Sequence, residues 1–395
     1  MYAIRTPMAT DKGMKYMEVY LDNSATTRPY DEVAQVVCDI MLNNYGNPSS
    51  LHRMGKKAED VVESARETIS STVYCTPSEL YFTSGGTESD NLAIIGYAMA
   101  NRRRGNKIIT QTTEHKAVLE SFKYLSENGF EVCILPVDGN GIVDMDAFEK
   151  ELDDNTILVS IMAVNNETGA VMPIDKISSK IDHEKCALHV DAVQAYGKIK
   201  LNVKKQSIDM LTISGHKIHG PNGIGALYIR KGLKVEKRFF GGQQERGMRS
   251  GTENPAAIAG FARAAEIKFA SFDECALKVG GLKERLIRGA LKIEGAKINS
   301  PEDSIYSVVN ISFTGVRSEV LLHVLESKGI YVSTGSACNS KKDKYSYVLK
   351  EMGLPVAAID SALRFSLSEF NTEEEIDYVC SVLSKEVPIL QKIMK

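Results

Sequence analysis

Short segments rich in β-branched, aromatic and other apolar residues alternate with helical patterns between about residues 79 and 230. Leu92, Ile95 and Met99 recur at spacings of three and four, which predicts a helix after the first apolar segment. Several apolar segments lack polar alternation, as is typical of strands buried on both faces. Strands that alternate with helices predict a mainly parallel, helix-covered sheet, the α/β class. The predicted strands lie in ELYFTS, KIITQ, EVCILPV, TILVSIMAV, ALHVDAV, DMLTISG and GALYIR.

The pattern changes at about residue 262, where long charged helical segments begin and the strand-like SVVNISFTG and ALRFSLSEF follow. At 395 residues the chain exceeds the size of an ordinary single core. We therefore expect a large α/β domain and a smaller α+β domain, joined by a helix. The predicted limits are an N-terminal extension at 1–17, a small domain formed by 18–30 and 268–395, and a large domain at 31–267.

Charged residues make up 25% of the chain and hydrophobic residues 43%, which is ordinary for a folded, water-soluble protein. The net charge of -3 provides no basic field for nucleic acid, and we interpret the RRR run at 102–104 as a solvated helix end. No apolar segment is long enough to span a bilayer. The seven cysteines are widely scattered, which favours a reducing compartment and predicts a cytoplasmic protein without membrane partners.

Lys217 lies between a predicted strand and a glycine-rich turn, GPNGIG, in a position where open α/β sheets bind ligands. A single lysine is ordinarily a solvated amine. Here Ser214 and His216 lie beside it and can bind an anion. Asp191 ends the preceding apolar strand, and a buried carboxylate there needs a cationic or hydrogen-bonding partner. A protonated pyridine nitrogen of pyridoxal phosphate (PLP) is one such partner; the alternative is a cap of a helix that begins at Ala192.

A turn of small residues, TSGGTESDN at 83–91, joins a predicted strand to a predicted helix, with Thr87 near the helix start. Backbone N–H groups at such a terminus can bind an anion, although an ordinary strand–helix connection fits equally well. No Walker motif is present. We interpret GPNGIG as a tight turn.

Together these segments resemble a known family, the class V aminotransferase-like cysteine desulfurases of the NifS/IscS type. The resemblance extends over nearly the whole chain, from residue 20 to residue 379. It implies a PLP-dependent transferase of the aspartate aminotransferase-like fold type I. The motifs that carry it are YLDNSATT, NYGNPSSLH, FTSGGTESDN, TEHKAV, VNNETGA, HVDAVQ, SGHKIHGPNGIG, RSGTENP, STGSAC, RFSL and EEEIDYV.

The resemblance implies a role for each matching residue around the cofactor. Lys217 would form the Schiff base with PLP, Asp191 would pair with the pyridine nitrogen, and His115 would stack on the ring and move protons. Gln194 and Asn166 would bind the side of the phenolic oxygen.

Further roles concern the phosphate and the substrate. Arg364 would bind the substrate carboxylate through its planar, bidentate guanidinium, with Asn166 nearby. A threonine from a second subunit would complete the phosphate site, which implies a homodimer. The phosphate-binding residues would be Gly86, Thr87, Ser214 and His216, together with Thr252 of that second subunit.

Cys338 distinguishes a desulfurase from other members of the fold. Most free cysteines are inert, and we interpret the other six in that way. Cys338 follows Gly335 and precedes NSKKDKYS, which predicts an exposed loop whose lysines favour the thiolate. That thiolate would attack the sulfur of PLP-bound L-cysteine, become a persulfide, and pass the sulfur to an acceptor such as an iron–sulfur scaffold or a tRNA-thiolation protein.

Other functions remain open from the residues alone. A selenocysteine lyase or a true aminotransferase would share the fold, and a non-catalytic assembly partner would lack bound PLP. The histidines and cysteine at positions 183, 186, 189, 216 and 219 show no recognised zinc spacing, so we expect no metal.

The sequence departs from the family pattern at three positions. Ser368 and Glu369 stand where glycine and often a basic residue are common, and His219 replaces a common tyrosine. The chain ends at Lys395 without the longer tail that housekeeping members use for scaffold docking, which leaves the sulfur acceptor open.

Overall fold

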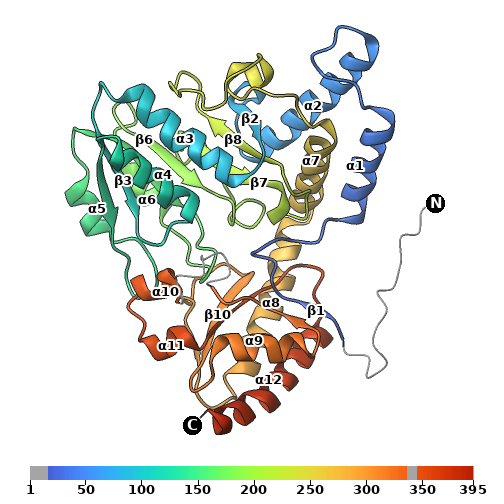
Figure 1. Cartoon of the computed structure of the whole chain (residues 1–395), viewed down its shortest axis with the longest axis vertical. Helices are drawn as coiled ribbons and strands as arrows, with labels where there is room; N and C mark the ends of the chain where they lie inside the picture. Colours follow the sequence, from blue (N-terminus) through green and yellow to red (C-terminus); the bar gives the residue numbers. More distant parts are fainter. Residues whose placement is uncertain (1–16, 336–344, 395) are drawn as a thin grey trace.

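A seven-stranded sheet forms the centre of the computed structural model, which describes residues 17–335 and 345–394 (Figure 1). The strand order is β2-β8-β7-β6-β5-β3-β4, and only β8 runs antiparallel to its neighbours. All seven strands predicted from the apolar segments are confirmed, as is the α/β class. Their bounds are β2 Leu80–Thr83, β3 Lys107–Gln111, β4 Glu131–Leu135, β5 Thr156–Met162, β6 Ala187–Asp191, β7 Met210–Ser214 and β8 Gly225–Ile229.

Helices cover both faces of this sheet because most of its strands are apolar on both sides. Met210 of β7 packs with α3 and α4, whereas its neighbour Leu211 packs with helices of the opposite face. The helix expected around Leu92 is therefore confirmed as α3. The helices are α1 Asp31–Asn43, α2 Arg53–Thr72, α3 Gly86–Asn101, α4 Lys116–Glu127, α5 Met145–Glu151, α6 Ile174–Lys180 and α7 Pro255–Ala270.

A second, smaller group of strands and helices, formed by β1 and the elements from α8 to α12, lies below the carboxyl ends of the parallel strands (Figure 1). We call it the small layer. Its central strand β10 pairs antiparallel with β9 and β12, and β1 pairs in parallel with β11. Its own hydrophobic cluster includes Val19, Phe313 and Phe365. The elements are β1 Val19–Tyr20, α8 Phe272–Ala290, β9 Ala296–Ile298, β10 Val308–Phe313, α9 Ser318–Glu326, β11 Ile330–Tyr331, α10 Tyr347–Glu351, α11 Val356–Asp360, β12 Ala362–Ser366 and α12 Glu373–Ile393.

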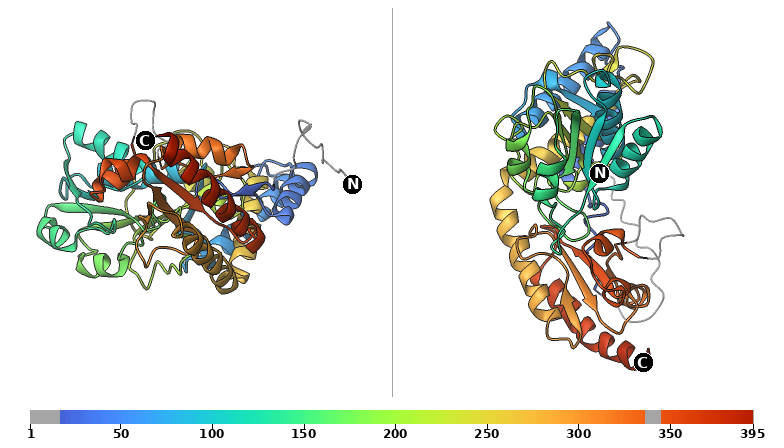
Figure 2. Two further views of the ribbon diagram at one scale, coloured as in Figure 1. Left: turned by 90° about the horizontal axis from the view of Figure 1, so that it is seen from below. Right: turned by 90° about the vertical axis from the view of Figure 1, so that its left-hand side faces the viewer.

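Helices α7 and α8 follow one another from the large sheet to the small one, so a helical segment joins the two layers (Figure 2). The predicted domain limits at 30/31 and 267/268 stay a prediction, and the expected extension falls almost entirely outside the described residues. The RRR run is exposed directly after α3, and GPNGIG contains a turn, as predicted. Among the described residues no helix combines the length and apolarity needed to cross a membrane.

Candidate active site

A cavity of about 330 Å³ lies at the carboxyl edge of the large sheet. Nine of the twelve predicted site residues line it, although they come from segments up to 278 positions apart in the sequence. Ser214 lines an adjoining cavity of about 420 Å³, Thr252 lines neither, and Cys338 lies outside the described residues. The nine are Gly86, Thr87, His115, Asn166, Asp191, Gln194, His216, Lys217 and Arg364.

Lys217 ends a short 3-10 turn, Gly215–Lys217, that follows β7 directly. Its ammonium nitrogen donates to the carbonyl oxygens of Ser24, at 2.5 Å, and Ala25, at 2.7 Å. The chain segment before α1 therefore orients the amine, a role for which the sequence pattern gave no signal.

Asp191 is the last residue of β6 and is buried. Its Oδ1 accepts a hydrogen bond of 2.9 Å from the Val193 N–H, within a turn rather than at the start of a described helix. Burial raises the pKa of the Asp191 carboxyl, and the nearby His115 and Lys217 oppose this rise. A carboxyl in this setting is suited to a cationic hydrogen-bond donor in the cavity.

His115 is the N-cap of α4, and its Nδ1 accepts the N–H of Ala117 at 3.2 Å. This bond requires Nδ1 to be unprotonated, so in the neutral ring Nε2 carries the proton. Burial lowers the pKa of His115, and the charge of Lys217 lowers it further against the attraction of Asp191. The structure thus favours a neutral imidazole at the cavity wall.

The adjoining cavity lies at the start of α3 and is lined by Gly86, Thr87, Ser214 and His216. A Cβ on Gly86 would lie 2.7 Å from Val193 Cγ2, so a side chain here requires Val193 to move. The buried Ser214 Oγ has no hydrogen-bond partner among the described residues. Burial, together with the charge of Lys217, lowers the pKa of His216 to about 4. These features suit an anion bound by N–H and O–H donors.

Arg364 reaches the cavity from β12 of the small layer. Its Nη2 forms an ion pair of 2.7 Å with Asp22, and its Nη1 donates to the Asn166 carbonyl at 3.0 Å. The buried Arg364 Nε and Asn166 Oδ1 have no partner among the described residues. The structure therefore adds Asp22 to the site. On the side of the cavity formed by the small layer, Arg364 Nε could donate a hydrogen bond to a ligand and Asn166 Oδ1 could accept one.

Three buried acids near the cavity had not been singled out from the sequence. Burial raises the pKa of Glu114 to about 8 and that of Glu167 to about 7, and it raises the pKa of Asp90 well above its ordinary value. Asp90 and Glu167 line the cavity itself. Each lies within a family motif, but a motif does not indicate which of its polar residues point inward.

Thr252 is exposed, and an ion pair links its loop to the first turn of α3, at the end of the site suited to an anion. Arg249, three residues earlier, pairs through Nε with Glu88 Oε1 at 2.8 Å, and Glu88 lies in the first turn of α3. The role of Thr252 in a second subunit stays a prediction.

The residues on either side of the segment that contains Cys338 lie at the cavity. Gly335 and Tyr347 both line it, and Ser346 donates to Glu167 Oε2 at 2.5 Å. In the described part of the chain, no group of three or more His, Cys, Asp or Glu side chains is placed to hold a metal ion.

The chain is similar to known proteins over most of its length. Residues 19–379 match the family Aminotransferase class-V. The cysteine desulfurase IscS of Methanosarcina thermophila is 44% identical over 376 residues, which cover 95% of this chain and 92% of that protein.

Two solved structures are similar over most of the chain. A NifS-like protein aligns with a TM-score of 0.89 and 40% identity, over 94% of this chain and all of that one. SspA in complex with cysteine aligns with a TM-score of 0.80 and 31% identity, over 90% of this chain and all of that one. The chain belongs to the class-V aminotransferase family and, within it, to the cysteine desulfurases of the NifS/IscS type. It therefore has the fold of the type I PLP-dependent transferases, as its sequence predicted.

Proposed function

We propose that this enzyme binds PLP in the cavity around Lys217 and takes sulfur from free L-cysteine, releasing L-alanine. The observation that carries this proposal is the convergence of Lys217, Asp191, His115 and Arg364 on one cavity. Bound there, PLP supplies an electron sink for the α-carbon of the substrate.

The residues present fit such a cofactor. The Lys217 amine can bind an aldehyde, the buried Asp191 carboxyl can accept a pyridinium N–H, and the neutral His115 ring can lie against an aromatic face. Ser214 Oγ, which lacks a partner among the described residues, faces the end of the site suited to a phosphate. Gln194 lines the same cavity and is oriented by a 3.0 Å bond from its Nε2 to the Ser24 carbonyl.

Recognition of the substrate would involve Arg364 and Asn166. A guanidinium can bind a carboxylate through two nitrogens, and Arg364 Nε is available in this role. Asn166 Oδ1 can accept a hydrogen bond from the ammonium of an amino acid. The cysteine complex of the similar protein SspA supports a cysteine-sized amino acid as the ligand.

Lys217 and His115 would transfer the protons. With PLP bound, the Lys217 amine would be placed to remove the α-proton of the substrate. The carbonyls of Ser24 and Ala25 hold the resulting ammonium in place. His115 Nε2 can carry a proton at the same wall.

The Cys338 thiolate would then attack the substrate sulfur. An S–S bond forms as the C–S bond breaks, the electron pair remains on carbon, and protonation of that carbon leads to alanine. The persulfide sulfur would pass to an acceptor protein, for which an iron–sulfur scaffold is the first choice because relatives of this chain are IscS proteins. A tRNA-thiolation protein is the second choice.

The variant Cys338→Ala tests the sulfur step. We expect the purified variant to keep the visible absorption of bound cofactor and to lose at least about a hundredfold of the sulfide release from L-cysteine, because its nucleophile is gone. Sulfide assay and absorption spectrum are measured on the same sample. Cys133→Ala, a partly buried cysteine on β4, is the matched control and should behave like the parent. Undiminished sulfide release by Cys338→Ala would refute the assignment.

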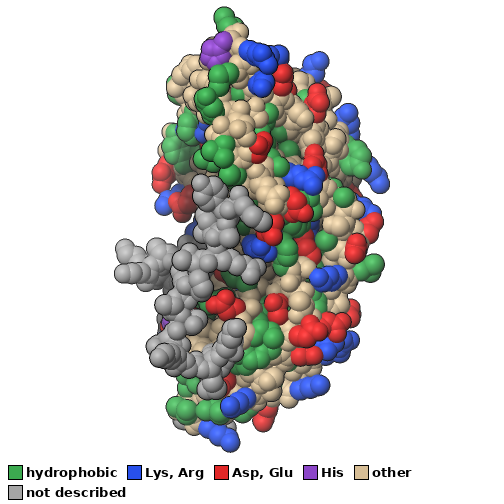
Figure 3. All heavy atoms as spheres, turned by 90° about the vertical axis from the view of Figure 1, so that its right-hand side faces the viewer, with side chains coloured by type: hydrophobic (Ala, Val, Ile, Leu, Met, Phe, Trp, Pro, Cys, Tyr) green, Lys and Arg blue, Asp and Glu red, His purple; other side chains and the backbone are tan. Residues whose placement is uncertain are grey.

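We also propose that the enzyme is a homodimer, joined through an apolar patch at the end of α1 and the loop that follows. Met41, Leu42, Tyr45 and Leu51 are all exposed there. Hydrophobic side chains gather toward the upper end of the face shown in Figure 3, where Figure 1 places α1 and α2. An apolar patch of this kind is typical of a protein interface.

The double variant Leu42→Glu/Leu51→Glu is expected to sediment as a monomer, whereas the parent sediments as a dimer, because two charges cannot be buried unpaired in an interface. Leu277→Glu, at an exposed leucine on α8, is the control and should remain dimeric. If Thr252 acts across subunits, the monomer should also retain PLP less well. A parent that sediments as a monomer would contradict the proposal.

A further inference from the structure

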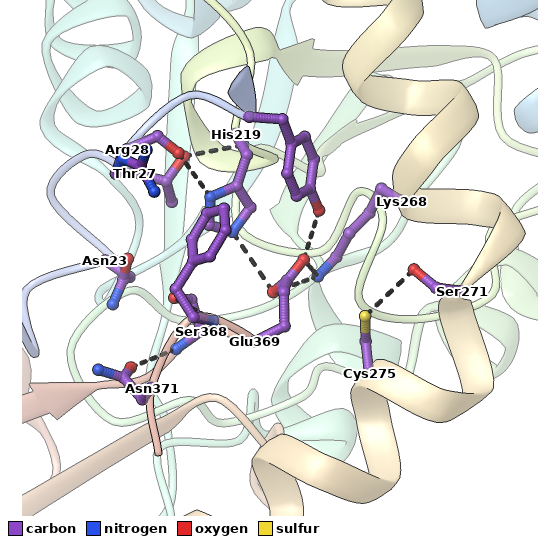
Figure 4. Close-up of polar contacts among 12 residues, drawn as sticks. Asn23, Thr27, Arg28, His219, Lys268, Ser271, Cys275, Ser368, Glu369 and Asn371 are labelled. Atoms are coloured by element: carbon purple, nitrogen blue, oxygen red, sulfur yellow. Dashed lines mark hydrogen bonds and ion pairs between the residues drawn. The ribbon is translucent and has the colours of Figure 1, made fainter. Parts of the chain in front are cut away.

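Glu369 lies at the centre of a buried polar group that joins the small layer to the segment before α1 (Figure 4). Lys268 Nζ donates to both carboxylate oxygens, at 2.8 and 2.9 Å, and the Tyr30 hydroxyl donates to Oε1. His219 Nε2 lies 3.3 Å from Oε2. We call Tyr30, His219, Lys268 and Glu369 the Glu369 cluster.

The Glu369 cluster is well shielded from solvent. The side chains of His219, Lys268 and Glu369 are 2%, 4% and 14% exposed. Burial opposes ionisation of the Glu369 carboxyl, but the hydrogen bonds and charges of His219 and Lys268 outweigh it and hold its pKa well below the usual range. These contacts favour the ionised form of the largely buried Glu369 carboxyl.

His219 links this carboxylate to the backbone that orients Lys217. Its Nδ1 lies 2.7 Å from the Arg28 carbonyl, and its backbone N–H donates to Thr27 Oγ1 at 2.8 Å. The φ of His219 is 65°, a left-handed conformation that a non-glycine residue adopts only when its surroundings hold it there.

The segment held in this way is the one that contacts the Lys217 amine. Thr27 Oγ1 donates to the carbonyl of His216 at 2.8 Å, next to Lys217 in the chain. Three residues before Thr27, the Ser24 carbonyl accepts from Lys217 Nζ, and so does that of Ala25. A displacement of His219 would therefore shift the Ser24 and Ala25 carbonyls, which accept hydrogen bonds from the Lys217 amine.

The negative charge of Glu369 also favours a protonated Lys217 amine, because both side chains line one small cavity. A small cavity of about 10 Å³ is lined by three lysines, at positions 198, 217 and 268, and Glu369 is the one acidic side chain among its lining residues. Burial, with the charges of Lys268 and Lys217, lowers the pKa of Lys198 to about 7. Removal of the Glu369 charge would leave these lysines without a carboxylate on the cavity wall.

We propose that Glu369 is a positioning residue for Lys217, acting through His219 and the 24–28 segment to keep the Lys217 amine protonated and directed at the Ser24 and Ala25 carbonyls. The proposal rests on the function assigned above to Lys217. It also joins two positions at which the sequence departs from the family pattern, His219 and Glu369, because the two side chains contact each other.

The test measures the reactivity of Lys217 in the full-length chain after removal of PLP. Acetic anhydride is added at neutral pH, and the acetylation rate of Lys217 is read by mass spectrometry relative to the exposed Lys297. We expect Glu369→Gln to raise this relative rate on the order of fivefold or more, since a neutral, less constrained amine is the reactive form. An unchanged rate would overturn the proposal.

A second variant covers the case in which Glu369→Gln leaves Lys268 unpaired and the chain fails to fold. Lys268→Met/Glu369→Gln removes both charges, and a smaller rise at Lys217 is expected, because the loss of the Lys268 charge offsets part of the loss of the carboxylate. His219→Asn, which tolerates a left-handed backbone but cannot reach Glu369, should produce a similar rise. Failure of both variants to alter Lys217 would overturn the proposal even if Glu369→Gln does not fold.

Two controls distinguish a specific effect on the Lys217 amine from a general loss of structure. Lys283 is a buried lysine of the small layer that donates to Ser304 Oγ at 2.7 Å, and its acetylation should not change. Asp377→Asn removes an exposed carboxylate that pairs with Arg285, and it should leave Lys217 unaffected. A rise at Lys283 equal to that at Lys217 would show a merely structural role. A parent that neither binds PLP nor releases sulfide would instead contradict the proposed function.

Discussion

Lys217→Ala is expected to abolish sulfide release from L-cysteine, with a loss on the order of a thousandfold or more, because in the proposed mechanism the same amine holds the cofactor and moves the α-proton. The variant should also lack the covalent link to PLP. Borohydride reduction followed by mass spectrometry should therefore add the mass of the cofactor to the parent chain and not to the variant.

Lys283→Met is the matched control for this experiment. Lys283 is also a buried lysine, but it donates to Ser304 Oγ and the Ile305 carbonyl within the small layer, away from the cavity. We expect this variant to keep both the reducible link and its activity, with some loss of stability. Sulfide release by Lys217→Ala at the parental rate would refute the role given to Lys217.

Arg364→Lys is expected to lower kcat/KM for L-cysteine by roughly 30- to 100-fold, mainly through a higher KM. This corresponds to a loss of about 2 to 3 kcal/mol, the range of a hydrogen bond to a charged group. The lysine keeps a positive charge near Asp22. Its single nitrogen cannot serve Asp22, the Asn166 carbonyl and a substrate carboxylate in the geometry of a guanidinium. Steady-state kinetics over a range of cysteine concentrations measures the effect.

Arg230→Lys provides the comparison, because Arg230 pairs with the buried Asp209 as Arg364 pairs with Asp22. Its Nε lies 2.5 Å from Asp209, at the other end of the sheet from the cavity. We expect a lower melting temperature and an unchanged KM. If Arg364→Lys also lowers only stability, Arg364 supports the fold and does not bind the substrate carboxylate.

Much of the candidate site was predictable because its residues occupy fixed positions relative to strands. Asp191 ends β6, and Lys217 follows β7, which is the neighbouring parallel strand. Because β6 and β7 pair in parallel, residues at their carboxyl ends lie close together, at the edge where open α/β sheets bind ligands. The particular chemistry came from the family resemblance and not from that geometry.

The sequence by itself determined the seven strands of the large sheet, because most of them are buried on both faces and such a strand requires an uninterrupted apolar segment. It also determined the family, through motifs spread along nearly the whole chain. The tertiary structure alone decided which distant residues meet: Asp22 with Arg364, His219 with Glu369, and Lys217 with the carbonyls of Ser24 and Ala25.

Local sequence patterns cannot predict such contacts, for a physical reason. A backbone carbonyl is present at every residue, so no residue type in the sequence indicates that the Ser24 and Ala25 carbonyls bind the Lys217 amine. A contact between side chains 150 positions apart, as between His219 and Glu369, depends on how the small layer packs against the large sheet. Only the folded chain brings Glu369 to the wall of the small cavity that Lys217 also lines.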